Sequence, residues 1–315
     1  MSLISASSES KFFFNVKIMC LFQTAIFTVI LLPFRVIVIC YLIVTAWFLA
    51  CIGLYGLSEE DLRRQPMTGW RRYTLYIITP YLRKNDDLCC SAFALRIIRG
   101  RQASRKEAPI LVVAPHSSFL DSCIVYATRM SSVIVRKESM DNYVGKLINY
   151  TQPVYVWRDD PNSRANTIKE IIQRATSKED WPQILIFPEG TCTNRSCLIT
   201  FKSGGFYPGV PVQPVTIRYP NARDTVTWTW EGPGAIVASL KLLWLTLTQV
   251  HSSCEIEFLP VYYPSEEERR DPKLYARNVR DVMAKGFQTG PRTPVQKIGL
   301  PFAKGKSNIT LFCIK

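Results

Sequence analysis

The hydrophobic positions of this chain are concentrated near its N-terminus, where two apolar stretches follow each other closely. Residues 18–34 are nearly all apolar, Pro33-Phe34-Arg35 interrupts them, and residues 36–57 are apolar again. The second stretch is long enough to span a bilayer, which takes about 20 residues. The pattern is compatible with one span preceded by an interfacial segment, or with a helical hairpin that enters one leaflet and turns at the break. In both arrangements Arg35 should lie at headgroup level or in the turn.

Beyond this region, short apolar runs alternate with segments of helical periodicity. The runs predict strands at residues 110–114, 133–135, 154–157, 184–187, 211–219, 225–230 and 254–261. The periodic segments predict helices at residues 118–130, 142–150, 164–177 and 275–287. Because strands and helices alternate, we expect an α/β fold with a mainly parallel central sheet flanked by helices, preceded by an N-terminal membrane-embedded helical segment.

The same pattern divides the chain into four segments. Residues 1–57 form the membrane anchor, and residues 58–108 are a basic, amphipathic helical segment that we expect at the membrane surface. Residues 109–288 hold the α/β catalytic domain. In residues 289–315 Pro, Gly and Lys dominate, so we expect this tail to be poorly ordered.

Charge and cysteine content narrow the classes of partner. The net charge of +14 predicts an anionic partner. No nucleic-acid-binding signature accompanies it, so we favour a lipid surface or a phosphorylated small molecule over nucleic acid. Ten cysteines without a CxxC pair, together with only two histidines, argue against a structural zinc site. We expect reduced cysteines and a cytosolic face, which the arginines after the apolar region also favour (Arg63, Arg64, Arg71 and Arg72).

Candidate chemistry begins directly after the first predicted strand, with His116 and Asp121. Such a pair can make a hydroxyl nucleophilic, because the imidazole takes the proton and the carboxylate orients the ring. On a straight helix the two residues would point roughly 140° apart. They can meet only if His116 lies in the turn before a helix and Asp121 in its first turn. A structural alternative makes Asp121 the capping-box acid of Ser118 and His116 a turn residue.

Further polar residues follow other predicted strands. Arg158 comes after residues 154–157, Glu189, Gly190 and Thr191 come after residues 184–187, and Pro211 and Pro214 lie in the Val-Pro-Val-Gln-Pro-Val sequence that starts at residue 210. The carboxyl ends of parallel strands meet at one edge of a sheet, where such groups can gather. Alternatively, Arg158 pairs with Asp159 on the surface and Glu189 caps a turn.

This ordered set of motifs resembles that of the glycerolipid acyltransferase family, the HxxxxD acyltransferases, over residues 110–220. Cys192, which follows Glu-Gly-Thr, and the sequence around Pro211 are similar to the lysophosphatidylcholine acyltransferase branch. In that branch the resemblance extends from about residue 35 to about residue 283. Several members of the branch carry calcium-binding EF-hand segments. No such loop occurs in these 315 residues, so either this member lacks the segments or the chain is a shortened product, and calcium regulation is not among our predictions.

The resemblance implies a role for each motif residue. His116 would be the general base that takes the proton from the free hydroxyl of a lysophospholipid as it attacks an acyl-CoA thioester, and Asp121 would hold the imidazole. No acyl-enzyme is needed, because the acceptor alcohol is itself the nucleophile. The remaining residues would bind substrate: Arg158 the acceptor phosphate, Glu189, Gly190 and Thr191 the glycerol-phosphate portion, and Pro211 and Pro214 the acyl-donor side.

The resemblance therefore implies an acyl-CoA-dependent O-acyltransferase of phospholipid biosynthesis and remodelling, with lysophosphatidylcholine as acceptor. It implies acyl-CoA as co-substrate, no cofactor and no metal. The implied location is the endoplasmic reticulum membrane, with the catalytic domain on the cytosolic side and the Golgi or lipid droplets as alternatives. One competing hypothesis is a 1-acylglycerol-3-phosphate acyltransferase that makes phosphatidic acid. Another is a membrane-bound lipid-binding scaffold without turnover.

Overall fold

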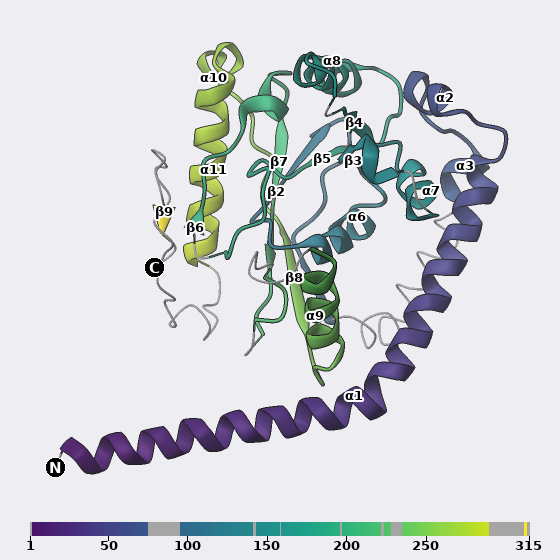
Figure 1. Cartoon of the computed structure of the whole chain (residues 1–315). Helices are drawn as coiled ribbons and strands as arrows, with labels where there is room; N and C mark the ends of the chain where they lie inside the picture. Colours follow the sequence, from purple (N-terminus) through teal and green to yellow (C-terminus); the bar gives the residue numbers. More distant parts are fainter. Residues whose placement is uncertain are drawn as a thin grey trace.

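The sheet at the centre of the molecule has the strand order β1-β8-β7-β2-β5-β3-β4 (Figure 1). The computed structural model describes residues 2–74, 95–140, 143–157, 159–195, 197–221, 224–227, 235–289 and 312–313. Its strands are β1 Leu95–Arg99, β2 Ile110–Ala114, β3 Ser132–Arg136, β4 Val154–Val156, β5 Ile184–Ile186, β7 Val212–Arg218 and β8 Ser253–Phe258. Every neighbouring pair is parallel except β7 and β8, which confirms the mainly parallel sheet.

Helices flank this sheet and precede it. They are α1 Ser2–Leu54, α2 Glu59–Arg64, α3 Trp70–Tyr73, α6 Cys123–Ala127, α7 Tyr143–Asn149, α8 Ser163–Thr176, α9 Ala235–Leu247, α10 Glu266–Arg270 and α11 Pro272–Thr289. Short 3₁₀ helices cover Phe119–Ser122 (η2), Lys137–Met140 (η3) and Ser203–Phe206 (η4). Two further strands, β6 Cys197–Leu198 and β9 Phe312–Cys313, form an antiparallel pair.

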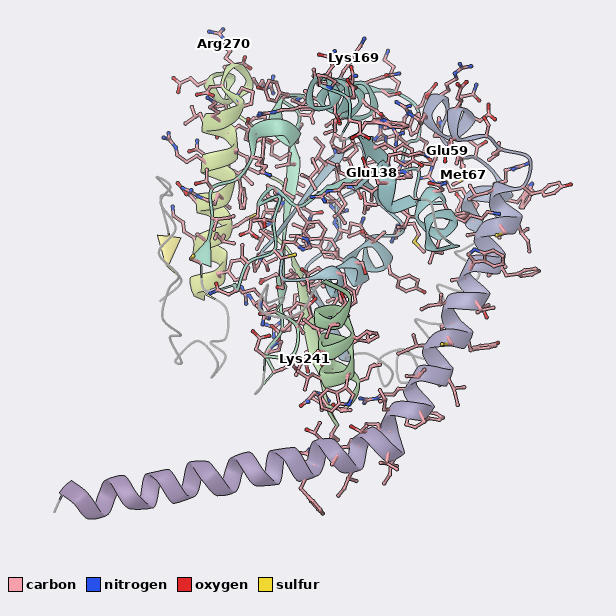
Figure 2. All side chains as sticks on the ribbon, viewed as in Figure 1. Glu59, Met67, Glu138, Lys169, Lys241 and Arg270 are labelled. Carbon is pink, nitrogen blue, oxygen red and sulfur yellow. The ribbon has the colours of Figure 1, made fainter. Side chains whose placement is uncertain are left out.

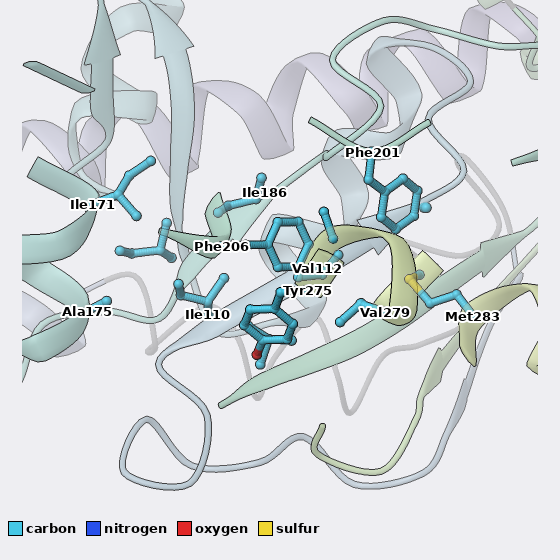
Figure 3. Packing of buried hydrophobic residues seen from close by; sticks show 14 of the residues in the cluster. Ile110, Val112, Ile171, Ala175, Ile186, Phe201, Phe206, Tyr275, Val279 and Met283 are labelled. Carbon is cyan, nitrogen blue, oxygen red and sulfur yellow. The ribbon is translucent and has the colours of Figure 1, made fainter. Parts of the chain in front are cut away.

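Sequence alternation in β2 explains why both faces of the sheet are covered. Ile110, Val112 and Ala114 pack on one face with residues of α8 and α11, among them Ile171 and Tyr275 (Figure 3). Leu111 and Val113 pack on the other face with Ile124 of α6 and with β7 and β8. All five β2 residues are buried, as expected of a central strand in a parallel sheet that has helices on both sides.

Helix α1 runs without interruption through the sequence Pro33-Phe34-Arg35, so the prediction of a hairpin turn there is wrong. A proline inside a helix removes one backbone hydrogen bond and can kink the helix without ending it. Figure 1 shows that α1 bends once along its length. The portion Phe22–Leu54 is long and apolar enough to cross a membrane, with a mean hydropathy of 2.6 in its most apolar window. Its role as an anchor stays a prediction.

Arg35 is held by protein carbonyl groups instead of lying in a turn. It is buried, and its guanidinium donates to the backbone oxygens of Leu247 at 2.7 Å, Gln249 at 2.6 Å and Val250 at 3.3 Å. These carbonyls belong to the C-terminal end of α9 and the residues after it, where a helix has unpaired acceptors and a partial negative charge. Trp244 of α9 also donates to the Thr28 hydroxyl at 3.0 Å. Through these hydrogen bonds, Arg35 stabilises the packing of α9 against α1.

We expect Arg35→Leu to destabilise the protein, because the α9 carbonyls lose three hydrogen bonds from a charged donor. The expected cost is about 2 kcal/mol, which corresponds to a midpoint of thermal unfolding lower by a few degrees. The measurement is thermal unfolding of the full chain in detergent. Arg64→Leu is the matched control, because Arg64 is exposed and its ion pair is with the equally exposed Glu60. Equal midpoints for the two variants would contradict the assignment.

The segment after α1 differs from its prediction as a basic helical region over residues 58–108. Helices α2 and α3 are present, and residues 75–94 lie outside the described residues. Met67, labelled in Figure 2, packs with Ala50, Leu62 and Tyr150 between α1 and α7. Its amide also donates to Gln152 at 2.8 Å.

Strand β1 is the clearest correction within that segment. It pairs with β8 over five positions, from Leu95 with Ser253 to Arg99 with Glu257, so the sheet begins before residue 109. The open edge of β8 requires hydrogen-bond partners, and this demand outweighs the local helical pattern.

Two further predictions lie near the C-terminal half of the sheet. Residues 225–227 are not a strand, because the Asp224 carboxylate accepts the amides of Val226 and Thr227 and forms a turn. Residues 228–230 lie outside the described residues, as does the predicted tail apart from 312–313. Helix α9 was not predicted.

Candidate active site

His116 and Asp121 meet just beyond the carboxyl end of β2. The Asp121 carboxylate accepts a hydrogen bond from His116 Nδ1 at 2.8 Å. The same oxygen accepts the amides of Ser117 and, at 3.0 Å, Ser118. Ser118 in turn caps η2 through its side chain. Asp121 is therefore both the capping acid and the partner of the imidazole, so the two alternatives derived from the sequence hold together.

Asp121 has a further partner that the motif did not reveal. Its second oxygen accepts the hydroxyl of Tyr219 at 2.7 Å, and the carboxyl group is fully buried. Tyr219 follows β7, which lies parallel to β2, so the sheet brings together residues 98 positions apart. Burial raises the pKa of Tyr219, which keeps this hydroxyl a donor. The only sequence signal was a tyrosine at the last position of the strand predicted at residues 211–219.

The imidazole of His116 stacks on Phe187 with the ring centroids 4.3 Å apart. Burial by itself lowers the pKa of His116, but hydrogen bonds with Asp121 and Cys192 outweigh it and raise that pKa to about 9. The side chain is 23% exposed. Since Nδ1 is engaged by Asp121, the other ring nitrogen is the one that can accept a proton.

Glu189 supports His116 from the turn after β5. It is buried, and its carboxyl oxygens accept the backbone amides of His116 at 2.8 Å and Ile199 at 3.4 Å. Burial raises the pKa of Glu189 to about 7, against the opposing effect of these amides. The amide of Thr193 donates to the His116 carbonyl at 2.7 Å. Both backbone groups of His116 are thus held by the Glu-Gly-Thr-Cys-Thr segment.

A cavity of about 2090 Å³ opens beside the imidazole. Near His116 it is lined by Ser118, Gly190, Thr191 and Cys192. One part is apolar and includes Ala46 of α1, Val125, Met130, Leu147 and Ile148. Another part is basic and includes Arg164 of α8, Lys202, and Lys273 and Arg277 of α11. The cavity can therefore hold a molecule that has an apolar portion and an anionic portion with its reacting centre at His116.

The remaining predicted site residues are not brought next to His116 within the part of the chain that the structure describes. Arg158 lies outside the described residues, although its sequence neighbour Trp157 lines the cavity. Pro211 and Pro214 do not line the cavity, and the structure does not bring them to His116. Val212 pairs with Ile110 and Pro214 with Val112, so Pro211 precedes the amino end of β7 and Pro214 lies within the sheet, whereas His116 follows the carboxyl end of β2. Within the described ranges, no three His, Cys, Asp or Glu side chains are placed to hold a metal ion.

The family model that matches this chain and two of its curated relatives are named as acyltransferases. The family model named Acyltransferase matches residues 96–218. A curated relative from Drosophila melanogaster, named lysophosphatidylcholine acyltransferase, is 54% identical over 263 residues, which are 83% of this chain and 48% of the relative. Human lysophosphatidylcholine acyltransferase 1 is 50% identical over 266 residues, 84% of this chain and 48% of that protein. The chain thus spans about half the length of these relatives.

Among solved structures, the chain is similar to the 1-acyl-sn-glycerophosphate acyltransferase PlsC from Thermotoga maritima. The TM-score is 0.53 at 16% sequence identity, and the match covers 86% of this chain and all of that one. At this identity the likeness concerns the fold alone.

Proposed function

Because this chain belongs to the acyltransferase family, in its lysophosphatidylcholine acyltransferase branch, we propose that it transfers a fatty acyl group from acyl-CoA to the free hydroxyl of a lysophospholipid. The observation that carries this proposal is the His116–Asp121 pair on the wall of a large cavity. Lysophosphatidylcholine is the proposed acceptor, since the relatives are named for it. The reaction would serve phospholipid biosynthesis and remodelling.

In the proposed mechanism the acceptor hydroxyl gives its proton to the His116 ring nitrogen that does not contact Asp121, while its oxygen attacks the thioester carbonyl. The tetrahedral intermediate expels the CoA thiolate, which takes that proton from the imidazolium. Asp121 accepts from Nδ1 throughout and stabilises the positive ring. Tyr219 and the amides of Ser117 and Ser118 hold the carboxylate in place. Atoms and charge balance without an enzyme-bound acyl group.

The acceptor phosphate is assigned to Arg158, because guanidinium groups pair well with phosphate oxygens. Gly190 and Thr191 line the cavity beside His116, so they can contact the glycerol portion directly. Glu189 acts differently from the role that the resemblance implied, since its oxygens face the backbone amides of His116 and Ile199. It positions the general base and the turn that carries Gly190.

The proposed location follows from the apolar helix and the basic residues after it. Helix α1 would anchor the chain in the endoplasmic reticulum membrane, and the sheet domain would face the cytosol by the positive-inside rule. The apolar part of the cavity includes Ala46, which belongs to α1. Acyl chains could therefore reach His116 from the bilayer side.

The raised pKa of His116 predicts a pH-dependent rate. Below pH 9 most of the imidazole is protonated, and only the neutral form can accept the proton of the hydroxyl. We expect kcat/KM to rise about tenfold per pH unit below this value and to level off above it. The measurement is a pH profile of initial rates, with controls showing that the protein and the thioester stay intact at each pH. A rate independent of pH between 6 and 9 would contradict the assignment of the general base.

The function itself is tested by offering labelled oleoyl-CoA to membranes that contain the full chain. The acceptors are lysophosphatidylcholine, lysophosphatidylethanolamine, lysophosphatidylserine and lysophosphatidic acid, with membranes lacking the chain as control. Product from lysophosphatidylcholine supports the proposal. Product from lysophosphatidic acid alone would move the chain to phosphatidic acid synthesis. Product from none would contradict the enzymatic proposal and favour a lipid-binding scaffold.

A further inference from the structure

The cavity beside His116 is lined by more positively charged than negatively charged side chains. Six basic and three acidic side chains line it. The acids are largely engaged: Asp160 accepts from Asn162 and Asn166, Asp271 accepts the amide of Lys273, and Asp281 pairs with Arg280. By contrast, five basic side chains of the lining form no ion pair within the part of the chain that the structure describes: Arg136, Arg164, Lys202, Lys273 and Arg277. The six basic side chains outnumber the three acidic ones, so the lining carries a net charge of +3.

Two of the basic side chains that line the cavity come from one face of α11. Lys273 and Arg277 are separated by four positions, so they lie above each other on the helix and both line the cavity. The opposite face of α11 packs into the core through Tyr275, Val279 and Met283 (Figure 3). That packing orients α11 and leaves its basic face toward the cavity. The two side chains are exposed, so a soluble anion can reach them.

Lys202 connects this basic face to the reaction centre. Its backbone amide donates to Pro188 at 2.8 Å, which fixes it next to the turn after β5. Its ammonium lies so close to Gly190 that a Cβ atom there would be 2.4 Å from Nζ. Gly190 also has a φ of +63°, a backbone conformation that favours glycine. Basic side chains thus line the cavity both next to the turn that carries Gly190 and along α11.

The apolar part of the cavity lies elsewhere, among α6, α7 and α1. Figure 1 shows α7 and α11 on opposite sides of β2, the strand that leads to His116. A substrate whose reacting carbon sits at His116 must then place an apolar portion toward α7 and an anionic portion toward α11. Acyl-CoA has this form: an acyl chain on one side of the thioester, and on the other a pantetheine arm that ends in a diphosphate and a ribose 3′-phosphate.

We infer that Lys273 and Arg277, together with Arg164 and Lys202, bind the phosphates of acyl-CoA. The inference rests on the proposed function and extends it by naming where the donor's nucleotide lies. Guanidinium and ammonium groups form short, charge-assisted hydrogen bonds with phosphate oxygens, and the cavity offers several of them at one end. The acceptor phosphate is assigned to a different residue, Arg158, by the proposed function.

The test compares two double variants of the full chain in vesicles of phosphatidylcholine, which carry no net charge. Lys273→Ala/Arg277→Ala removes two charges from the cavity. Lys169→Ala/Arg270→Ala removes the same two charges from exposed sites that do not line it (Figure 2). We expect the first variant to raise the KM for oleoyl-CoA about tenfold or more, with kcat and the lysophosphatidylcholine KM unchanged. The control variant should behave as wild type.

A second arm identifies the phosphates. Adenosine 3′,5′-bisphosphate should bind the wild-type chain and compete with oleoyl-CoA, and its binding should be lost in Lys273→Ala/Arg277→Ala. Oleoyl-dephospho-CoA should be a poorer donor for the wild type, and this disadvantage should shrink in the variant. A raised KM for lysophosphatidylcholine alone would assign the basic face to the acceptor. Equal effects of the two double variants would mean that the KM for oleoyl-CoA depends on the overall surface charge and not on the basic face of α11. Either result overturns the inference.

The binding arm also separates the inference from the proposed function. If wild-type membranes transfer no acyl group but the chain binds adenosine 3′,5′-bisphosphate through Lys273 and Arg277, the proposed reaction fails and the nucleotide site stands. If transfer proceeds and the bisphosphate binds equally to wild type and variant, the reaction stands and the site assignment fails.

Discussion

Replacing His116 with alanine is expected to lower kcat/KM for acyl transfer by about 10²–10⁴-fold, the usual contribution of a positioned general base. Alanine leaves nothing to accept the hydroxyl proton, and Asp121 cannot replace the imidazole because it is fully buried. The backbone contacts of His116 with Glu189 and Thr193 involve main-chain atoms, so the variant keeps them. The protein should therefore remain folded and bound to membranes.

The measurement is initial-rate transfer from oleoyl-CoA to lysophosphatidylcholine by wild type and variant at equal protein level. The chain provides its own matched control in His251→Ala, because His251 is exposed, does not line the cavity and forms a hydrogen bond with the Ser253 hydroxyl at 2.9 Å. That variant should transfer at the wild-type rate. Flotation with vesicles and thermal unfolding show whether both variants are intact. Wild-type turnover in His116→Ala would remove this residue from the mechanism.

The second large effect is expected from Asp121→Asn. Asparagine has nearly the same shape, and its oxygen can still accept from Ser117 and Ser118, so the turn should persist. The negative charge beside the imidazole is lost, and with it the stabilisation of the imidazolium that forms during attack. We expect kcat/KM to fall by about 10²–10⁴-fold. The pKa of His116 should also fall, since burial lowers it and Asp121 opposes burial.

Two readouts separate orientation of the base from a merely structural role. The pH profile of Asp121→Asn should level off at a lower pH than that of wild type, even though its maximal rate is lower. Tyr219→Phe is the graded comparison, because it removes one hydrogen bond from Asp121 and leaves the charge. It should reduce the rate only a few-fold, as expected for one neutral hydrogen bond. An unchanged pH profile in Asp121→Asn would contradict the role of its charge.

Much of the sheet could be predicted from the sequence because its strands are locally marked. Ile110–Ala114 and Ile184–Ile186 are apolar runs that end in polar clusters, and β2 and β5 lie where those runs predicted them. Strand β1 escaped prediction because its surroundings are basic and its strand character depends on β8, more than 150 residues away in the sequence. Local periodicity contains no information about such a partner.

Within the site, too, some contacts were predictable from the local sequence and others depend on distant parts of the chain. The meeting of His116 with Asp121 was predictable, since a turn and a short helix decide it within five residues. The location of Glu189 beneath His116 was not, because it depends on the pairing of β2 with β5. Pro211 and Pro214 differ in the opposite direction: a motif implied a place beside the substrate, whereas Pro211 precedes β7, Pro214 pairs with Val112 inside the sheet, and neither lines the cavity.

The sequence by itself determined the apolar helix, the alternation that builds an α/β sheet, and the His116–Asp121 pair, because each depends on residues that are close along the chain. Only the tertiary structure decided which distant groups surround that pair. Tyr219 reaches Asp121, Arg35 reaches the end of α9, and α11 turns its basic face toward the cavity through contacts that span the fold. The physical basis of these contacts is the register of the sheet and the packing of its two faces. Both depend on residues that are far apart in the sequence, so no single stretch of residues determines them.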